Sequence, residues 1–165
     1  MRVGFGLGSN LGDKPANIRE ALRRIEAQGL ARLEKVSQIY RTPPWGDLDQ
    51  GDFANACAIG DTALAPYELL AAVKKIEADM GRAPTRRWGP RLIDVDILFL
   101  GDHAIDDPEL TLPHKELFRR GFVLAPLAEI APELVLDGVS MREALAGADA
   151  TGVRPWSDKE SPTHP

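Results

Sequence analysis

The chain has 165 residues, of which 44% are hydrophobic and 27% are charged, and its formal net charge is −5. These values are typical of one folded domain, and the negative charge argues against a general nucleic-acid binder, because a polyphosphate would be repelled over most of the surface. No apolar stretch approaches the roughly 18 residues of a membrane span, and residues 1–6 lack a signal peptide's apolar region, so we expect a cytoplasmic protein with no membrane partner.

The first forty residues predict a strand, a helix and a second strand. In residues 3–8 bulky side chains alternate with glycines, so one face of the first strand is bulky and the other is bare. Asp13 can cap a helix with an apolar stripe, and Gly29 marks its end. Residues 30–40 predict a second strand in which the alternation slips once, as it does at a bulge.

The middle of the chain predicts a third strand, a second helix and a fourth strand. Residues 53–59 alternate as a strand does, and Pro66 begins a helix that ends at Gly81. Residues 92–100 are apolar on both faces apart from two aspartates, which predicts a central strand. The lone cysteine, Cys57, has apolar neighbours and is expected to be a buried structural thiol.

The order strand, helix, strand, strand, helix, strand indicates a ferredoxin-like α+β domain. It predicts a four-stranded antiparallel sheet with two helices on one face, plus C-terminal additions. Residues 101–150 would either cover the opposite face or leave it open as a ligand platform. We expect one domain over residues 1–150 and a disordered tail from Thr151.

Asp94 and Asp96 are the sharpest chemical feature of the sequence. Two apart on a strand, they point to the same face with Cα atoms about 6–7 Å from each other. At an effective dielectric of about 20, carboxylates about 6 Å apart repel by roughly 3 kcal/mol, which is costly in an apolar strand unless a cation lies between them. Magnesium fits, since it takes one or two carboxylates plus phosphate oxygens. The alternative is a structural pair satisfied by the nearby arginines.

A basic loop runs directly into the aspartate strand. Residues 82–91 contain four arginines and no acid. Guanidinium groups match phosphate oxygens and neutralise charge as a phosphoryl group transfers, and the Gly and Pro residues would let the loop move as a lid. The alternative is a solvated basic loop. Beside two candidate metal ligands, the loop favours a small anionic substrate.

Further candidates are weaker. His114 and Arg120 follow the aspartate strand, but a lone histidine is more often structural. The glycines of residues 4–8 do not have the spacing of a dinucleotide fingerprint, and the chain has no Walker A sequence. Any ATP would therefore be bound without a Gly-Lys phosphate loop.

Together these motifs resemble the hydroxymethyldihydropterin pyrophosphokinase family. The matching segments follow the family's order over about residues 3–136, and the combination of Arg-Trp-Gly-Pro-Arg with Asp-x-Asp is highly specific. The segments are Gly8–Gly12, Tyr40–Pro44, Phe53–Ala56, Arg87–Arg91, Asp94–Asp96, Pro113–His114, Arg120–Phe122 and Glu129–Glu133.

The resemblance implies transfer of pyrophosphate from ATP to 6-hydroxymethyl-7,8-dihydropterin in folate synthesis, with release of AMP. It implies a monomer whose partners are these two small molecules. Two magnesium ions would be the cofactors, held by Asp94 and Asp96. Arg82 and Arg91 would be catalytic by neutralising charge on the transferring group.

The resemblance also assigns residues to the two substrates. The expected ATP contacts are Lys74, Ile97, Thr111, His114 and Arg120. The expected pterin contacts are Thr42, Pro44, Phe53, Asn55, Trp88 and Phe122. Of these, Phe53 and Phe122 would sandwich the ring, and Asn55 would read its polar edge, since an amide offers donors and an acceptor together.

The sequence departs from the family at four positions. Lys74 stands where a glutamine is common, and Lys115 stands where a tyrosine often follows the histidine. Phe53 replaces a common tyrosine, and Trp45 is bulkier than the usual aliphatic residue. These departures concern the fine contacts to the substrates rather than the reaction class.

Two other classes of function compete with this interpretation. A ferredoxin-like ligand-binding or nucleic-acid-binding module is disfavoured by the aspartate pair, because a binding sheet gains nothing from buried carboxylates. Another ATP-dependent small-molecule kinase would be distinguished by its product, since it would form ADP rather than AMP.

Overall fold

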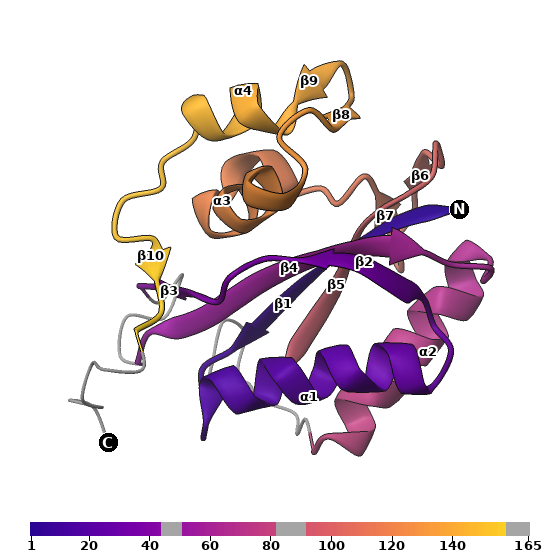
Figure 1. The fold of residues 1–165 in the computed structure, drawn as a ribbon. Helices are drawn as coiled ribbons and strands as arrows, with labels where there is room; N and C mark the ends of the chain where they lie inside the picture. Colours follow the sequence, from indigo (N-terminus) through magenta and orange to yellow (C-terminus); the bar gives the residue numbers. More distant parts are fainter. Residues whose placement is uncertain (44–50, 82–91, 158–165) are drawn as a thin grey trace.

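The computed structural model describes residues 1–43, 51–81 and 92–157, and its centre is an antiparallel sheet (Figure 1). The strand order is β10-β3-β4-β1-β5, with β2 paired to β4 beside β3. The strands are β1 (Arg2–Ser9), β2 (Arg32–Val36), β3 (Tyr40–Thr42), β4 (Phe53–Asp61), β5 (Asp94–Leu100) and β10 (Arg154–Pro155). With its helices, the sheet makes an α+β fold, as the sequence predicts, but the described sheet has six strands rather than the four expected.

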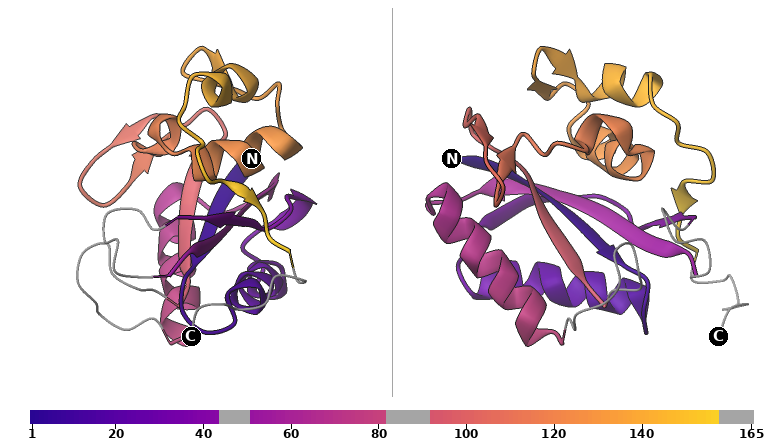
Figure 2. Two further views of the ribbon diagram at one scale, coloured as in Figure 1. Left: turned by 90° about the vertical axis from the view of Figure 1, so that its left-hand side faces the viewer. Right: turned by 180° about the vertical axis from the view of Figure 1, so that it is seen from behind.

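Two helices, α1 (Lys14–Ala27) and α2 (Pro66–Asp79), cover one face of the sheet (Figures 1 and 2). The Asp13 side chain accepts a hydrogen bond from the Ala16 amide at 3.2 Å and so caps α1. The bulky face of β1 packs against both helices, with Phe5 fully buried in the same cluster as Ile18 and Ile76. Burial of this apolar face is the main force that holds the layers together.

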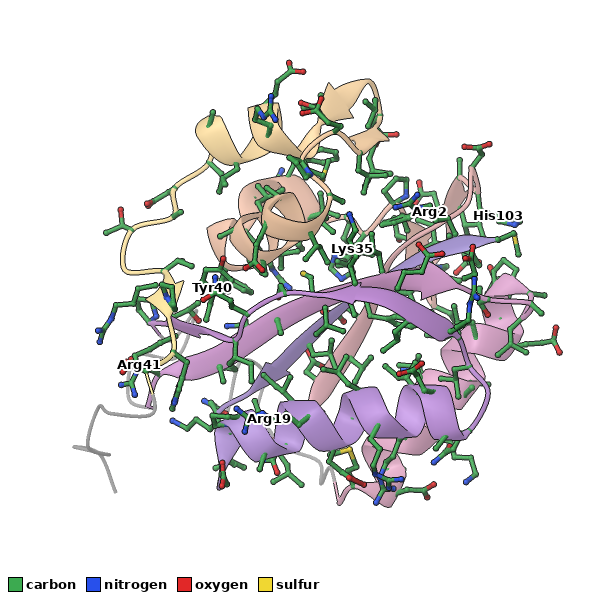
Figure 3. All side chains as sticks on the ribbon, in the orientation of Figure 1. Arg2, Arg19, Lys35, Tyr40, Arg41 and His103 are labelled. Carbon is green, nitrogen blue, oxygen red and sulfur yellow. The ribbon has the colours of Figure 1, made fainter. Side chains whose placement is uncertain are left out.

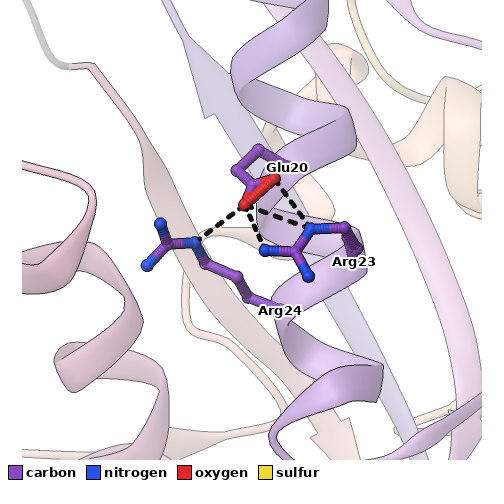
Figure 4. A network of polar contacts seen from close by, with 3 residues as sticks. All are labelled: Glu20, Arg23 and Arg24. Carbon is purple, nitrogen blue, oxygen red and sulfur yellow. Dashed lines mark hydrogen bonds and ion pairs between the residues drawn. The ribbon is translucent and has the colours of Figure 1, made fainter.

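The solvent side of α1 carries a network of charged side chains (Figure 4). The Glu20 carboxylate accepts hydrogen bonds from Arg23 at 2.6 Å and from Arg24 at 3.1 Å. These bonds, that from Arg23 first, lower the pKa of Glu20 to about 2. Exposed ion pairs of this kind contribute little to stability, so the buried face of α1 carries most of its attachment.

The chain after β5 covers the opposite face of the sheet (Figure 2). Helix α3 (Gly121–Ile130) packs across β4, where Cys57 and Ile59 join Leu98 of β5 in a second apolar cluster. The smaller elements are β6 (Ile105–Asp106), β7 (Thr111–Leu112), the 3-10 helix η1 (Leu117–Arg119), β8 (Val135–Leu136), β9 (Val139–Ser140) and α4 (Met141–Ala146). The remainder of the chain therefore covers this face rather than leaving all of it open.

The expected second strand over residues 30–40 is two strands. Both β2 and β3 pair with β4, and the chain leaves the ladder between them at Ser37. The Ser37 hydroxyl accepts the Cys57 amide at 3.0 Å, so a side chain replaces the backbone acceptor that would have continued the strand. The expected bulge is present as well, because the register of β2 against β4 shifts between Leu33 and Lys35, where the alternation slips.

Two further expectations are corrected by the strand order. The aspartate strand, β5, is an edge strand and not a central one, because it pairs only with β1 among the described strands of the sheet. Its side chains are apolar on both faces because helices cover both faces. Residues 154–155 form β10 against β3, so residues 151–157 are not the disordered segment that we expected from Thr151.

No helix within residues 1–43, 51–81 and 92–157 has the length and apolar character needed to cross a membrane.

Candidate active site

The bare face of β1 separates two groups of polar side chains. Gly8 pairs with Asn55 of β4 on one side and with Asp94 of β5 on the other. Gly6 likewise lies between Cys57 and Asp96. Because glycine has no side chain, the surface between Asn55 and Asp94 is backbone, and a flat or extended ligand can approach it closely.

Along the first part of β1, apolar side chains from β5 cover this glycine face. A Cβ atom at Gly4 would clash with the Phe99 ring, and one at Gly6 would lie 3.2 Å from a Leu98 methyl group. At Gly8 the nearest atom is polar, since a Cβ atom there would lie 3.0 Å from Asn55 Oδ1. The apolar filling thus gives way to polar side chains at the end of β1, where the candidate site begins.

Asp94 and Asp96 are half-buried on this face of β5. Asp96 Oδ2 lies 3.9 Å from His114 Nε2. The backbone places that histidine, because the His114 amide donates to the Leu98 carbonyl at 2.8 Å on the outer edge of β5. A histidine that looked weak in the sequence is therefore adjacent to the aspartate pair.

The tautomer of His114 follows from its second contact. The Glu116 amide donates to His114 Nδ1 at 3.2 Å, so the neutral ring carries its proton on Nε2, the nitrogen nearest Asp96. Burial, together with the positive charge of Arg120, lowers the pKa of His114 against the opposing effect of Asp94. The neutral imidazole then presents an N–H donor to the site.

A buried carboxylate, Glu77, was missed by the sequence analysis. It lies on α2, is only 5% exposed, and accepts the amide of Val95 at 2.8 Å, between the two aspartates. This bond ties α2 to the start of β5. The sequence did contain a sign of this residue, because Glu77 directly follows Ile76 on the apolar face of α2. A charged residue at such a position is costly unless it has a specific partner.

These side chains line a cavity of about 590 Å³ between α2, β5 and the β6–β7 hairpin. All the residues expected to contact ATP except Arg120 line it, namely Lys74, Ile97, Thr111 and His114. Its six carboxylates are Glu77, Asp94, Asp96, Asp106, Asp107 and Glu109. Lys74 and Lys115 are the lysines of the lining. With so many carboxylates, a polyphosphate would be repelled unless cations accompanied it.

The donor atoms of the cavity suit a hard divalent cation. Among the described residues no group of three or more His, Cys, Asp or Glu side chains converges on one point. Asp94 and Asp96 would therefore supply only part of a coordination shell. Magnesium is usually bound in this way, by one or two carboxylates with water and substrate phosphates completing six ligands.

The other side of Gly8 holds the described residues among those expected to contact the pterin. Asn55 Nδ2 donates to the Thr42 hydroxyl at 2.7 Å, and both side chains are buried. Phe53 lies two residues before Asn55 on the same face of β4. Phe122 lies in the first turn of α3, above that face, with the Arg120 guanidinium 5.6 Å from its ring centre. The structure thus gathers these four residues around the end of β3 and the start of α3.

Glu129 of α3 fixes the segment that leads into this region. Its carboxylate accepts the Tyr40 hydroxyl at 2.7 Å and the Gln38 amide at 3.2 Å. Tyr40 lies at the β3 end of the sheet (Figure 3). Burial, with a contribution from Glu129, raises the pKa of Tyr40. In the sequence Glu129 appears only as part of a motif. Its hydrogen bond to Tyr40 could not be predicted, because the two residues are 89 positions apart and share no local pattern.

Several expected site residues lie outside the described residues. They are Pro44, Trp45, Arg82, Trp88 and Arg91, together with the rest of the proposed lid. Their roles stay predictions.

The chain is similar in sequence to proteins of one known family. Residues 4–132 match the model of the 7,8-dihydro-6-hydroxymethylpterin-pyrophosphokinase family. A protein named 2-amino-4-hydroxy-6-hydroxymethyldihydropteridine pyrophosphokinase from Methylorubrum extorquens is 49% identical over 92% of this chain and 96% of its own length. A protein of the same name from Pseudomonas aeruginosa is 44% identical over 93% and 95%.

Similar folds occur among solved structures. A wild-type Plasmodium falciparum HPPK-DHPS crystal structure superposes with a TM-score of 0.71 at 16% identity, over 88% of this chain. The chain spans 42% of that longer protein. A further HPPK-DHPS structure, described as a complex with substrates, gives a TM-score of 0.69 at 15% identity. At this identity the likeness concerns the fold alone.

Proposed function

The chain belongs to the 7,8-dihydro-6-hydroxymethylpterin-pyrophosphokinase family and is a pyrophosphokinase of folate biosynthesis that uses ATP. From this premise we propose which of its residues bind ATP and which bind the pterin. ATP occupies the cavity beside Asp94 and Asp96, and the pterin occupies the region around Asn55. The observation that carries this division is the row Asn55–Gly8–Asp94, in which a bare backbone separates the two binding regions on one face of the sheet.

Asp94 and Asp96 would hold two magnesium ions beside the ATP phosphates. Such ions would supply positive charge that shields the phosphates and polarises the phosphorus under attack. The proposal is supported by the six carboxylates among the described residues of the cavity lining, because bound cations would offset their repulsion of a triphosphate. It is also supported by the two half-buried carboxylates of β5, since magnesium is usually bound by one or two carboxylates, with water and phosphate oxygens as its other ligands.

The remaining side chains of the cavity bind the nucleotide. His114 donates from Nε2 to a phosphate oxygen, and Arg120 adds positive charge beside it, in agreement with its effect on the pKa of His114. Lys74, Ile97 and Thr111 lie along the cavity wall and contact the adenosine part.

The pterin is recognised by an amide that is already oriented. One N–H of Asn55 is held by Thr42, and Oδ1 faces the bare surface at Gly8. The oxygen and the second N–H can then pair with the polar edge of the ring. Phe53 and Phe122 stack on its two faces, and Pro44 and Trp88 complete the pocket.

The hydroxymethyl oxygen of the pterin attacks the β-phosphorus of ATP in line, and AMP leaves. The chain contributes mainly position and charge, since phosphoryl transfer needs little covalent help. Arg82 and Arg91 neutralise charge that develops on the transferring group.

The test is a nucleotide analysis after incubation with ATP, magnesium and 6-hydroxymethyl-7,8-dihydropterin. We expect AMP and pterin diphosphate in equal amounts. A 6-methyl pterin, which lacks the attacking hydroxyl, is the matched control and should give no AMP. Formation of ADP, or turnover that ignores the pterin, would overturn the proposal.

A further inference from the structure

A C-terminal strap, which we define as residues 149–156, returns from α4 to the far edge of the sheet (Figures 1 and 2). It lies beyond residues 4–132, the part that matches the family model. Arg154 and Pro155 pair with Arg41 and Tyr40, and the Trp156 amide donates to the Ile39 carbonyl at 2.8 Å. The strap therefore adds an outer strand to β3.

Side chains reinforce this pairing. The Arg41 guanidinium lies 4.2 Å from the centre of the Trp156 ring, and Arg41 is only 8% exposed. Figure 3 shows Arg41 on β3, beside β10. Arg41 Nη1 also lies 3.6 Å from Asp52 Oδ2, at the residue before Phe53. A stacked cation that is also paired with a carboxylate connects the strap to β3 and to the start of β4.

The strap makes two close backbone approaches as well. A Cβ atom at Gly121 would collide with the backbone of Asp149 and Ala150. A Cβ atom at Gly152 would lie 2.8 Å from Pro43 Cγ. The first contact is next to Phe122 in the chain, and the second is next to Thr42.

We propose that the strap is a positioning element for the pterin-binding region. It holds β3, which carries Thr42, and the start of α3, which carries Phe122, at a fixed separation. The inference rests on the proposed location of the pterin at Thr42, Asn55 and Phe122. Trp156 is a positioning residue in it, because it acts through Arg41 and β3 and touches none of these three side chains in any contact that the structure describes.

The physical reason is the shortness of β3. Three residues give few ladder hydrogen bonds. Without the strap β3 would be a short edge strand, and such strands open easily. Pairing on both sides, to β4 and to β10, keeps Thr42 in place to orient Asn55. A pocket that is ordered before the ligand arrives binds more tightly, because less conformational freedom is lost on binding.

The test compares three variants of the full chain. Trp156→Ala removes the ring over Arg41, and Trp156→Phe keeps an aromatic face there. Met141→Ala is the matched control, because Met141 is fully buried in the apolar cluster with Leu124 and Leu127 and lies outside the strap, so the substitution should lower the stability of the fold. Affinity for the pterin is measured by calorimetry with a saturating non-hydrolysable ATP analogue and magnesium, and affinity for the analogue is measured separately.

For Trp156→Ala we expect a loss of pterin affinity of about 10-fold, with affinity for the ATP analogue changed less than about 2-fold. Trp156→Phe should recover most of the loss, and Met141→Ala should lower Tm while leaving pterin affinity intact. Unchanged pterin affinity in Trp156→Ala would overturn the proposal. So would an equal loss for both ligands, or an equal loss in Met141→Ala.

Pterin binding by the wild type and by Asn55→Ala distinguishes a failure of this inference from a failure of the proposed function. If the wild type fails to bind the pterin, the proposed function is at fault. If the wild type binds the pterin but Asn55→Ala does not weaken it, the pocket is misplaced. Where the wild type binds the pterin and Asn55→Ala weakens that binding, each of the three contrary outcomes named above counts against the strap itself.

Discussion

Asn55 and Asp94 pair with the same residue, Gly8, from the two sides of β1. Strands are about 4.8 Å apart, so the two Cα atoms are separated by roughly 10 Å of sheet with no side chain between them. The two substrates can therefore meet over β1 while each is held by its own strand. Variants on β4 and β5 should accordingly have separable effects on pterin and ATP.

Asp94→Asn and Asp96→Asn should each lower kcat by about 10²-fold or more, because each variant would lose a proposed ligand of the cation beside the reacting phosphates. The metal-free variants should unfold at the same Tm as wild type or higher, since like charges on one strand face are removed. Steady-state rates and thermal melts check both points. Asp102→Asn, in the exposed turn after β5, is the control for loss of one charge. Near-normal turnover in both site variants would leave the pair a structural role.

Asn55→Ala should weaken pterin binding by about 1–3 kcal/mol and ATP binding far less, because the ring edge and the Thr42 hydroxyl both lose their partner. Thr42→Val should act in the same direction but more weakly, since Asn55 remains and only its orientation is loosened. Calorimetric titrations with each substrate give the comparison. A larger effect on ATP than on pterin would place the pterin elsewhere.

Arg82→Ala and Arg91→Ala should lower kcat by about 10³-fold and change ATP affinity little, because their charge is needed most at the transition state. Single-turnover rates and the Kd for a non-hydrolysable ATP analogue separate the two effects. Arg119→Ala, an exposed arginine near the site in sequence, is the control. Variants impaired only in nucleotide affinity would indicate a ground-state phosphate clamp instead.

Tyr40→Phe should lower the free energy of unfolding by roughly 0.5–1 kcal/mol at pH 7, because the bond to Glu129 is lost. Burial raises the pKa of Tyr40, so the stabilisation is fully present below the ordinary tyrosine pKa of about 10 and is lost as pH rises above it. The difference between wild type and Tyr40→Phe should therefore shrink above about pH 10. Urea unfolding of both proteins from pH 7 to 11 measures it. A constant difference would mean that the phenol ionises equally in the folded and unfolded states.

Cys57 should be inert to alkylating reagents in the native protein. Its side chain is 1% exposed, its Sγ contacts the Val123 carbonyl, and burial raises the pKa of its thiol. Labelling with iodoacetamide at pH 8 should then follow global unfolding, rising with urea along the same transition as circular dichroism. Rapid labelling without urea would show local opening between α3 and β4.

Local signals in the sequence predicted most of the elements but not how the strands are ordered. Asp13, Pro66 and Gly81 mark helix ends through capping and backbone geometry, which depend on nearby residues alone. An apolar pattern indicates that both faces of a strand are buried, but it does not indicate which strands lie beside it. For this reason β5 was wrongly expected to be central. The break at Ser37 arises from a hydroxyl that meets Cys57, a tertiary contact.

The candidate site divides in the same way. Their spacing on one strand made Asp94 and Asp96 candidate metal ligands. The cavity that they line also contains His114, which the resemblance implied as an ATP contact. Glu129 and the strap were not predicted, because they act through contacts between residues far apart in the chain. A two-residue strand such as β10 is too short to have a hydrophobic pattern at all.

The edge position of β5 bears on self-association. An exposed strand edge can pair with the same edge of another molecule, and charged side chains on an edge strand oppose this. Asp94 and Asp96 occupy the first half of β5, before the His114 amide covers Leu98. The two aspartates that we propose as cation ligands would thus also oppose strand-to-strand aggregation. Neutralising both aspartates should raise light scattering on heating even where the folded protein becomes more stable.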